Sequence, residues 1–172
     1  MCDAKAAEYF EASVLAAYAG EIEVAFPARP DIPRAMVSEA ELSAVDEIRC
    51  FAAFARADTL HAAVDALFPY TFMYVPPSWL PYILGPILAD ALEPSSEHKH
   101  VNIVLDPLFY FFGPGAQGKD AIFWDVIQFL TVRQLRCIRA VFDVLTAGRP
   151  GAWSPSTVTR GLLGSFPPLS AP

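Results

Sequence analysis

The stretch ALFPYTFMYVPPSWLPYILGPILA, residues 66–89, decides the fold, because its 24 residues include no charged side chain. By length alone it could cross a bilayer, which takes about 20 apolar residues in a helix. It also holds five prolines, each of which removes a backbone donor and costs about 3 kcal/mol inside a helix. A lipid-exposed segment must satisfy all its backbone groups internally, and no Lys or Arg flanks this one to set an orientation. We therefore expect a buried core segment shared between short helices, with membrane association through residues 66–89 as the alternative.

The composition around this stretch is that of one globular domain. The chain has 172 residues, 54% of them hydrophobic and 18% charged, which is the opposite of the balance in a disordered chain. Cys2, Cys50 and Cys137 are odd in number and far apart, a pattern that builds neither a disulfide framework nor a zinc site. The N-terminus has no basic region followed by an apolar run, as a signal peptide would. These features predict free thiols and a cytoplasmic location.

The charge is negative and unevenly spread. The formal net charge is −7, and residues 1–86 hold twelve acidic and five basic residues, whereas residues 87–172 hold seven of each. A nucleic-acid or anionic-membrane binder must neutralise phosphates with Lys or Arg, so we expect no nucleic acid and no membrane among the partners. The acidity suits a basic protein partner, although it also serves solubility alone.

Apolar periodicity predicts helices before the central stretch. The first should begin after Asp3 and end or bend at Gly20, followed by an extended proline-rich linker over residues 27–33. Its apolar stripe recurs every four residues, with Leu15 beside it: Phe10, Val14, Tyr18, Ile22 and Phe26.

Capping residues place the next helices. Ser38 and Glu41 form an S-x-x-E capping box that predicts a helix running to about Ala55. Its inner face would be Leu42, Val45, Ile48 and Ala52. Asp58 or Thr59 should open another helix, which Pro69 closes.

Inside the central stretch, Ser78 should cap a helix over residues 78–92. Pro81 would sit in its first turn, where proline is tolerated, and Gly85-Pro86 should kink it.

The clearest helix lies near the C-terminus. Thr131 and Gln134 form a T-x-x-Q capping box, and Gly148 should end the helix. Its apolar stripe is Leu135, Ile138, Val141, Phe142 and Leu145. Residues 101–112 read as strand or helix, and we favour helix because no second strand is present to pair with them.

Taken together, these patterns predict a mainly α fold. We expect a single compact helical domain of about five to six helices with Pro-kinked core segments, over residues 1–148. Residues 149–172 form a Pro/Gly/Ser-rich tail that is loosely docked or disordered.

Two motifs resemble a known family. The run F-x-Y-V-P at residues 72–76 precedes an apolar helix, and F-L-T-x-x-Q at residues 129–134 heads another. With Ile22-x-x-Ala25-Phe26, they make residues 15–147 similar to the bacterial family called domain of unknown function 6714. The chain departs from that family at Pro77, where alanine usually follows the first proline, and at Phe51 or Phe54, where tryptophan is common. The resemblance implies a compact helical fold and a bacterial source, and no function.

Few residues suggest chemistry. His61 and Asp65 are one helical turn apart, a spacing at which a carboxylate can orient a general base, although without a nearby Ser or Cys nucleophile such a pair is more often a surface pair. His98 and His100 have no Cys or carboxylate pair to complete a metal shell. Residues 113–119 match G-x-x-x-x-G-K, but Asp120 stands where a phosphate loop needs Ser or Thr.

Three arginines are the candidate partner-binding residues. Arg133, Arg136 and Arg139 are spaced three apart on the last helix, opposite its apolar stripe. They could bind an acidic partner, or pair within the chain with Asp143 or the acidic first half.

With no catalytic, cofactor or metal site recognised, we expect a non-enzymatic bacterial protein-binding domain. One specific form is an immunity or antitoxin-like protein that masks a basic partner. The alternatives are an enzyme that uses His61 and Asp65, and the membrane-associated protein described above.

Overall fold

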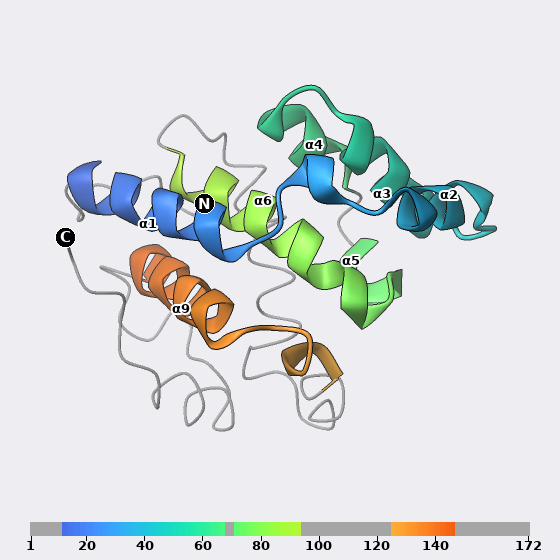
Figure 1. Ribbon diagram of the computed structural model, residues 1–172. Helices are drawn as coiled ribbons and strands as arrows, with labels where there is room; N and C mark the ends of the chain where they lie inside the picture. The colour runs from blue at the N-terminus through green and yellow to red at the C-terminus, as the bar shows by residue number, and fades with distance from the viewer. Residues whose placement is uncertain (1–11, 68–70, 94–124, 147–172) are drawn as a thin grey trace.

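The computed structural model describes residues 12–67, 71–93 and 125–146, which are mainly helical and contain no strand (Figure 1). The mainly α fold class is confirmed. The expectations for Asp3, for His98 and His100, for residues 101–120 and for the tail 149–172 lie outside these residues. The elements, in order, are α1 (Ala12–Ala25), the 3-10 turn η2 (Arg29–Asp31), α2 (Arg34–Leu42), α3 (Asp46–Arg56), α4 (Leu60–Ala66), α5 (Thr71–Tyr74), the 3-10 turn η3 (Pro77–Trp79), α6 (Leu80–Leu92) and α9 (Val132–Thr146).

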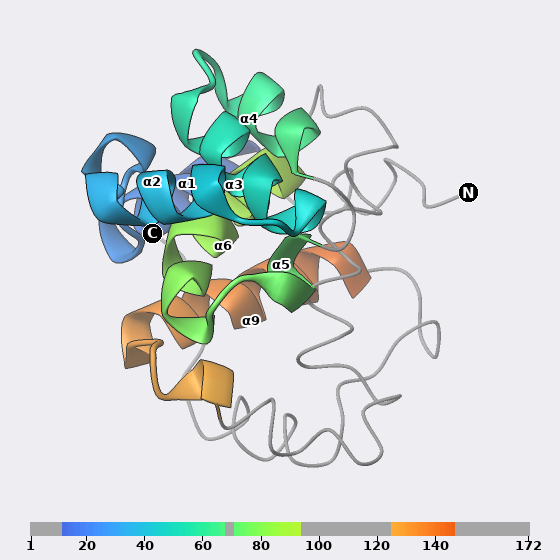
Figure 2. The same cartoon turned by 90° about the vertical axis from the view of Figure 1, so that its right-hand side faces the viewer.

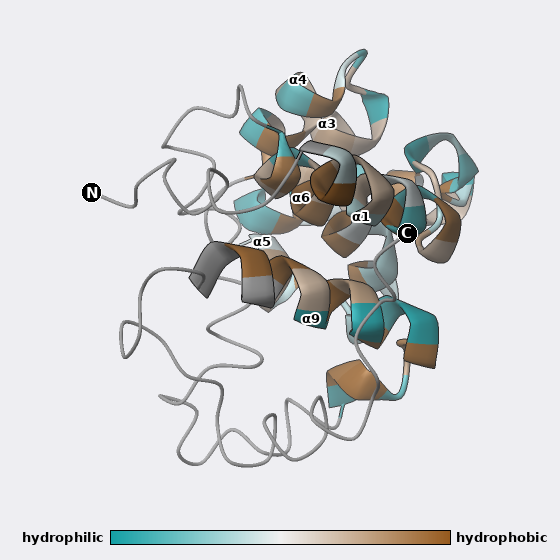
Figure 3. Cartoon of the chain, turned by 90° about the vertical axis from the view of Figure 1, so that its left-hand side faces the viewer, coloured by the Kyte–Doolittle hydropathy of each residue, from teal (hydrophilic) through white to brown (hydrophobic). Residues whose placement is uncertain are grey.

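Helix α6 lies at the centre of these elements. It contacts α1, α4 and α9, and Figures 1 and 2 show it between α9 on one side and α3 and α4 on the other. Its ribbon is largely brown, the hydrophobic end of the colour scale, in Figure 3. The residues that α6 buries are Leu80, Pro81, Ile83, Leu84, Gly85, Ile87, Leu88, Asp90 and Leu92. The burial expected for this uncharged stretch is therefore confirmed for α6, whereas Met73 and Tyr74 are 39% and 52% exposed.

The same stretch is divided among several short elements. Within the described residues it contributes the end of α4, then α5, η3 and most of α6. None of the helices in this part of the chain has the length and hydropathy needed to cross a membrane.

Proline does not interrupt α6. Pro81 lies in the first turn, as expected, and Pro86 lies inside the helix, which nevertheless runs from Leu80 to Leu92. Pro86 has no N–H to donate to the carbonyl of Tyr82, and this loss costs free energy. Burial of Ile83, Leu84 and Ile87 against the rest of the core supplies the compensating stability, because each buried aliphatic side chain contributes about 1.5–3 kcal/mol.

Aromatic rings join α3 to the start of α6. The Phe51 ring centroid lies 4.7 Å from that of Trp79 and 5.8 Å from that of Phe54, and both pairs are tilted. Phe51 and Phe54 are fully buried. Both phenylalanines come from one face of α3, whose apolar positions are buried as its periodicity requires.

The helix expected over residues 38–55 is wrong, because the chain breaks there into α2 and α3. Helix α2 starts at Arg34, directly after Pro33, so Ser38 lies inside it and caps nothing. The break occurs at Ser43, whose Oγ accepts a hydrogen bond from the Val45 N–H at 3.1 Å. Leu42 and Val45, placed on the inner face by the single-helix interpretation, are 86% and 37% exposed.

Three other local predictions differ from the structure. Gly20 does not end α1, which continues to Ala25. The linker 27–33 contains the turn η2 and is not wholly extended. Ser78 lies within η3, and α6 begins without a side-chain cap. Prolines restrict the backbone angle φ both in the linker and before α6. They stand at positions 27, 30 and 33 of the linker, and at positions 76 and 77 before α6.

Two predicted caps are confirmed. The Thr59 Oγ1 accepts from the Ala62 N–H at 3.1 Å and opens α4. At the start of α9, the Gln134 N–H donates to Thr131 Oγ1 at 3.2 Å, and the Thr131 N–H donates to Gln134 Oε1 at 2.8 Å. Leu135, Ile138 and Val141 are buried as the apolar stripe requires.

Candidate functional site

The three candidate arginines of α9 do not form one exposed row. Arg133 is exposed and its guanidinium binds the Glu21 carboxylate of α1, with Nη2 and Nε at 2.8 and 3.1 Å from Oε2. Arg136 and Arg139 are half-buried, and Arg136 Nε is enclosed without a hydrogen-bond partner. Arg133 therefore pairs with the acidic first half of the chain, which was one of the two expected arrangements.

His61 lies between two carboxylates. Its Nε2 is 3.7 Å from Asp65 Oδ2, the expected neighbour one turn along α4, and its Nδ1 is 4.0 Å from Asp90 Oδ1 on α6. Asp90 is buried, whereas His61 and Asp65 are exposed. The sequence did not indicate Asp90, because it lies 29 positions away and only the packing of α4 on α6 brings it near. With a carboxylate near each ring nitrogen, the His61 side chain lies at the contact between α4 and α6.

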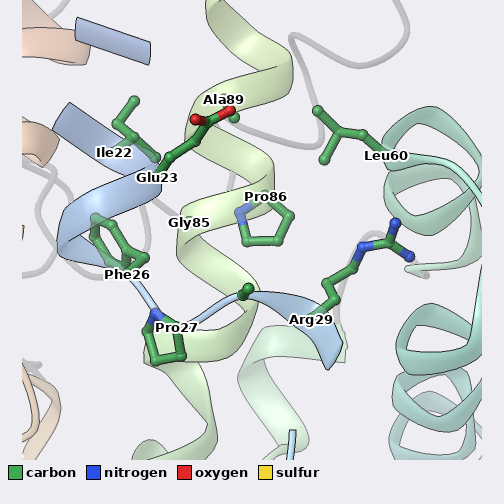
Figure 4. Close-up of a pocket in the computed structure, with 10 residues that line it drawn as sticks. Ile22, Glu23, Phe26, Pro27, Arg29, Leu60, Gly85, Pro86 and Ala89 are labelled. Atoms are coloured by element: carbon green, nitrogen blue, oxygen red, sulfur yellow. The ribbon is translucent and has the colours of Figure 1, made fainter. Parts of the chain in front are cut away.

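A groove crosses α6 beside this pair. Its volume is about 440 Å³, and it lies between the C-terminal end of α1 and the start of α4 (Figure 4). Gly85, Pro86 and Ala89 of α6 form its floor, while Phe26 and Leu60 stand on opposite sides. These are apolar groups, so the groove offers a hydrophobic surface that can bury a side chain of a ligand.

Gly85 shapes this groove by letting two helices approach closely. A Cβ built on Gly85 would lie 2.5 Å from the Cβ and 3.0 Å from the Cγ of Phe26. Real Cβ atoms are not found at such distances from carbon, so only glycine allows this crossing of α1 and α6. The crossing places the Phe26 ring at the groove wall.

The two charged groups at the groove have different roles. Arg29 Nη1 donates to the carbonyl oxygens of Ala57 at 2.6 Å and Phe54 at 3.4 Å, at the C-terminal end of α3. A cation is stabilised there by the negative end of the helix dipole. Glu23 is exposed on the α1 side, and in the view of Figure 4 its carboxylate overlaps Ala89, while the Arg29 guanidinium points away toward the neighbouring helix.

The groove therefore combines an apolar floor with a carboxylate at one edge. This arrangement fits a side chain or segment that carries both an apolar body and a positive charge. Among the residues that the structure describes, no group of three or more His, Cys, Asp or Glu side chains is placed to hold a metal ion.

Sequence reasoning did not identify this groove. Ile22 and Phe26 stand out in the sequence as apolar stripe residues, and Gly85-Pro86 as a helix irregularity, but no spacing links the two segments. The local signal was the glycine inside an apolar helix, which often marks a close backbone approach.

Comparisons of the chain with protein-family models, with curated proteins and with solved structures give no match.

Proposed function

We propose that this chain is a non-enzymatic protein-binding domain whose groove across α6 receives a basic, partly apolar segment of another protein. The observation that carries the proposal is the pairing of an apolar floor at Gly85, Pro86 and Ala89 with the exposed Glu23 carboxylate. A lysine or arginine side chain can bury its methylene stem on such a floor and place its charge at the carboxylate.

The charge of the surrounding chain supports the same partner. The groove walls come from α1 and α4, both within the half that holds twelve acidic and five basic residues. A negative field over this surface attracts a basic partner and increases the rate of association.

One specific form of this function is an immunity or antitoxin-like role, in which the acidic domain masks a basic protein. A bacterial cytoplasmic source and membership of the family named above belong to the same proposal. The aromatic, proline-bounded segment and the T-x-x-Q helix support the family membership.

A pair of designed peptides tests the binding mode. One fluorescent 12-residue peptide would alternate leucine and lysine, and the second would replace every lysine with glutamate. We expect the full chain to bind the basic peptide only, with an affinity that falls as salt rises, because salt screens exposed charges beyond a Debye length of about 10 Å at 0.1 M. Fluorescence anisotropy measures both peptides under identical conditions.

Two matched variants separate the groove from general acidity. Glu23→Gln removes the carboxylate at the groove, and Glu39→Gln removes one exposed carboxylate of α2 that does not line it. We expect Glu23→Gln to weaken binding of the basic peptide clearly more than Glu39→Gln does. Equal weakening by the two variants, or equal binding of the two peptides, would contradict the proposal.

A further inference from the structure

A second pocket concentrates positive charge in the acidic half of the chain. Its volume is about 360 Å³, and its lining comes from η2, from α2 and from the C-terminal end of α3. Residues 1–86 contain five basic residues, and three of them line this one pocket: Arg29, Arg34 and Arg56. Such a concentration is unexpected in a half with seven more acidic than basic residues, and it indicates a site for an anion.

The three guanidinium groups are held differently. The Arg29 guanidinium is held by hydrogen bonds from Nη1 to the Ala57 and Phe54 carbonyl oxygens, so its orientation is fixed before any ligand binds. Arg56 forms an ion pair with Glu41. Arg34 is exposed and forms no ion pair within the described part of the chain. The lining thus holds three cations, and Glu41 neutralises one of them.

Helix α2 adds to the positive potential. Arg34 is its first residue, and the pocket is lined by Arg34, Val37 and Ser38, which share one face of the helix at i, i+3 and i+4. The positive end of the α2 dipole is therefore beside the pocket. The Ser38 hydroxyl supplies a neutral donor on the same face.

The remaining lining is apolar. It consists of Pro30, Ile32, Val37 and Ala55. Ile32 is buried, and Val37 and Ala55 are partly buried against the core, so this wall is fixed by packing. A ligand with only a charged group would leave the wall uncovered.

We propose that this pocket binds a phosphate monoester with a small apolar body. Among the residues that the structure describes, Arg29 and Arg34 form no ion pair, so their two positive charges match the two negative charges of a phosphate monoester. Planar guanidinium groups bind its oxygens in pairs. The apolar wall takes the organic part. The volume lies within the range of about 300–1,000 Å³ that is typical of small-molecule pockets.

This site does not depend on the proposed function. The two pockets share only Arg29 among their lining residues, and the Glu23→Gln variant leaves every lining residue of the phosphate site unchanged. Loss of peptide binding and loss of phosphate binding are therefore separate results.

The experiment is a titration of the full chain with inorganic phosphate, phenyl phosphate and acetate at constant ionic strength. The midpoint of thermal unfolding, Tm, reports binding, because a ligand that binds the folded state raises it by mass action. We expect a saturating rise with phenyl phosphate, a weaker one with inorganic phosphate, and none with acetate. Arg34→Gln should weaken the apparent affinity for phenyl phosphate by about tenfold or more, as loss of a charge-assisted hydrogen bond does.

Arg49→Gln is the matched control. Arg49 is also exposed and lies in the same half of the chain, but it pairs with Asp46 and does not line the pocket. We expect this variant to bind phenyl phosphate as the wild type does. An equal, non-saturating rise in Tm in the wild type and both variants would show only the general stabilisation by excluded salts. This result would overturn the proposal. So would equal weakening by both arginine variants, or acetate binding as tight as that of phenyl phosphate.

Discussion

The side chain of Gln134 donates a hydrogen bond from Nε2 to the carbonyl oxygen of Ala25 at 3.0 Å, across 109 positions of sequence. Through Oε1, the same amide accepts a hydrogen bond from the Thr131 N–H at 2.8 Å. Gln134 is 5% exposed. One buried amide therefore closes the capping box of α9 and satisfies a carbonyl at the C-terminal end of α1, where helical carbonyls have no partner of their own.

Replacement of Gln134 by leucine should destabilise the fold. Leucine is similar in size but leaves the Ala25 carbonyl and the Thr131 N–H unpaired, which costs about 1–3 kcal/mol. Urea unfolding followed by circular dichroism measures the free energy of unfolding. Gln128→Leu is the control, because Gln128 is exposed and, within the described residues, its side chain donates to the nearby Asp125 carbonyl. A loss of equal size in the two variants would contradict a bridging role for Gln134.

Alanine should have opposite effects at two helical glycines. At Gly85 the new Cβ would overlap Phe26. The shifts of side chain and backbone that such overpacking forces typically destabilise a fold by about 1–3 kcal/mol. At Gly20, which is exposed, a new Cβ would have no neighbouring atom within 4 Å, so Gly20→Ala should stabilise α1 by about 0.5–1 kcal/mol. Thermal and urea unfolding of the two variants give the comparison. Stabilisation by Gly85→Ala would show that α1 and α6 do not cross at this distance.

The buried thiol of Cys137 should make stability depend on pH in the alkaline range. Burial, assisted by the Glu21 carboxylate and opposed by Arg133, raises its pKa from 9.0 to about 11. The folded state therefore keeps this proton longer than the unfolded state does. The stability that the thiol contributes is present below about pH 9 and is lost as pH rises toward about 11.

Unfolding free energies at about pH 8 and about pH 10.5 test this linkage. We expect Cys137→Ala to lose less stability than the wild type over this interval. Cys50→Ala, which removes a half-buried thiol of α3, is the matched control. If the unfolding free energy of Cys137→Ala fell with pH as steeply as that of the wild type, this thiol would not be the titrating group.

The Arg133–Glu21 ion pair should contribute little to stability. Its two side chains are 47% and 40% exposed, and exposed pairs typically contribute about 0.2–1 kcal/mol. A double-mutant cycle with Arg133→Gln and Glu21→Gln measures the coupling. The coupling should decrease in high salt, and a value well above this range that salt leaves unchanged would indicate a buried pair.

Local signals in the sequence were sufficient for some helix starts and misleading for others. Thr59 and the Thr131–Gln134 box act as predicted, because a capping hydrogen bond joins residues only three apart. The Ser38–Glu41 box has the same spacing but lies inside α2, since Pro33 had already started that helix. A capping pattern is compatible with a helix interior, so the spacing alone does not mark a start.

The candidate sites were less predictable than the helices. Three of the five bases in the first half line one pocket, although Arg29 and Arg56 are 27 positions apart and belong to different elements. Asp90 near His61 is a similar case. In each case the proximity follows from how α2, α3, α4 and α6 pack, and no periodicity within one segment encodes it.

The sequence by itself determined that the uncharged run which forms α6 would be buried in a helical fold, because its apolar side chains gain free energy on leaving water. It also determined where several helices start, because those hydrogen bonds are local. Only the tertiary structure decided that Gly85 meets Phe26, that Gln134 reaches Ala25, and that the arginines gather beside α2. These contacts depend on the relative placement of whole helices, and that placement is set by the packing of many side chains at once.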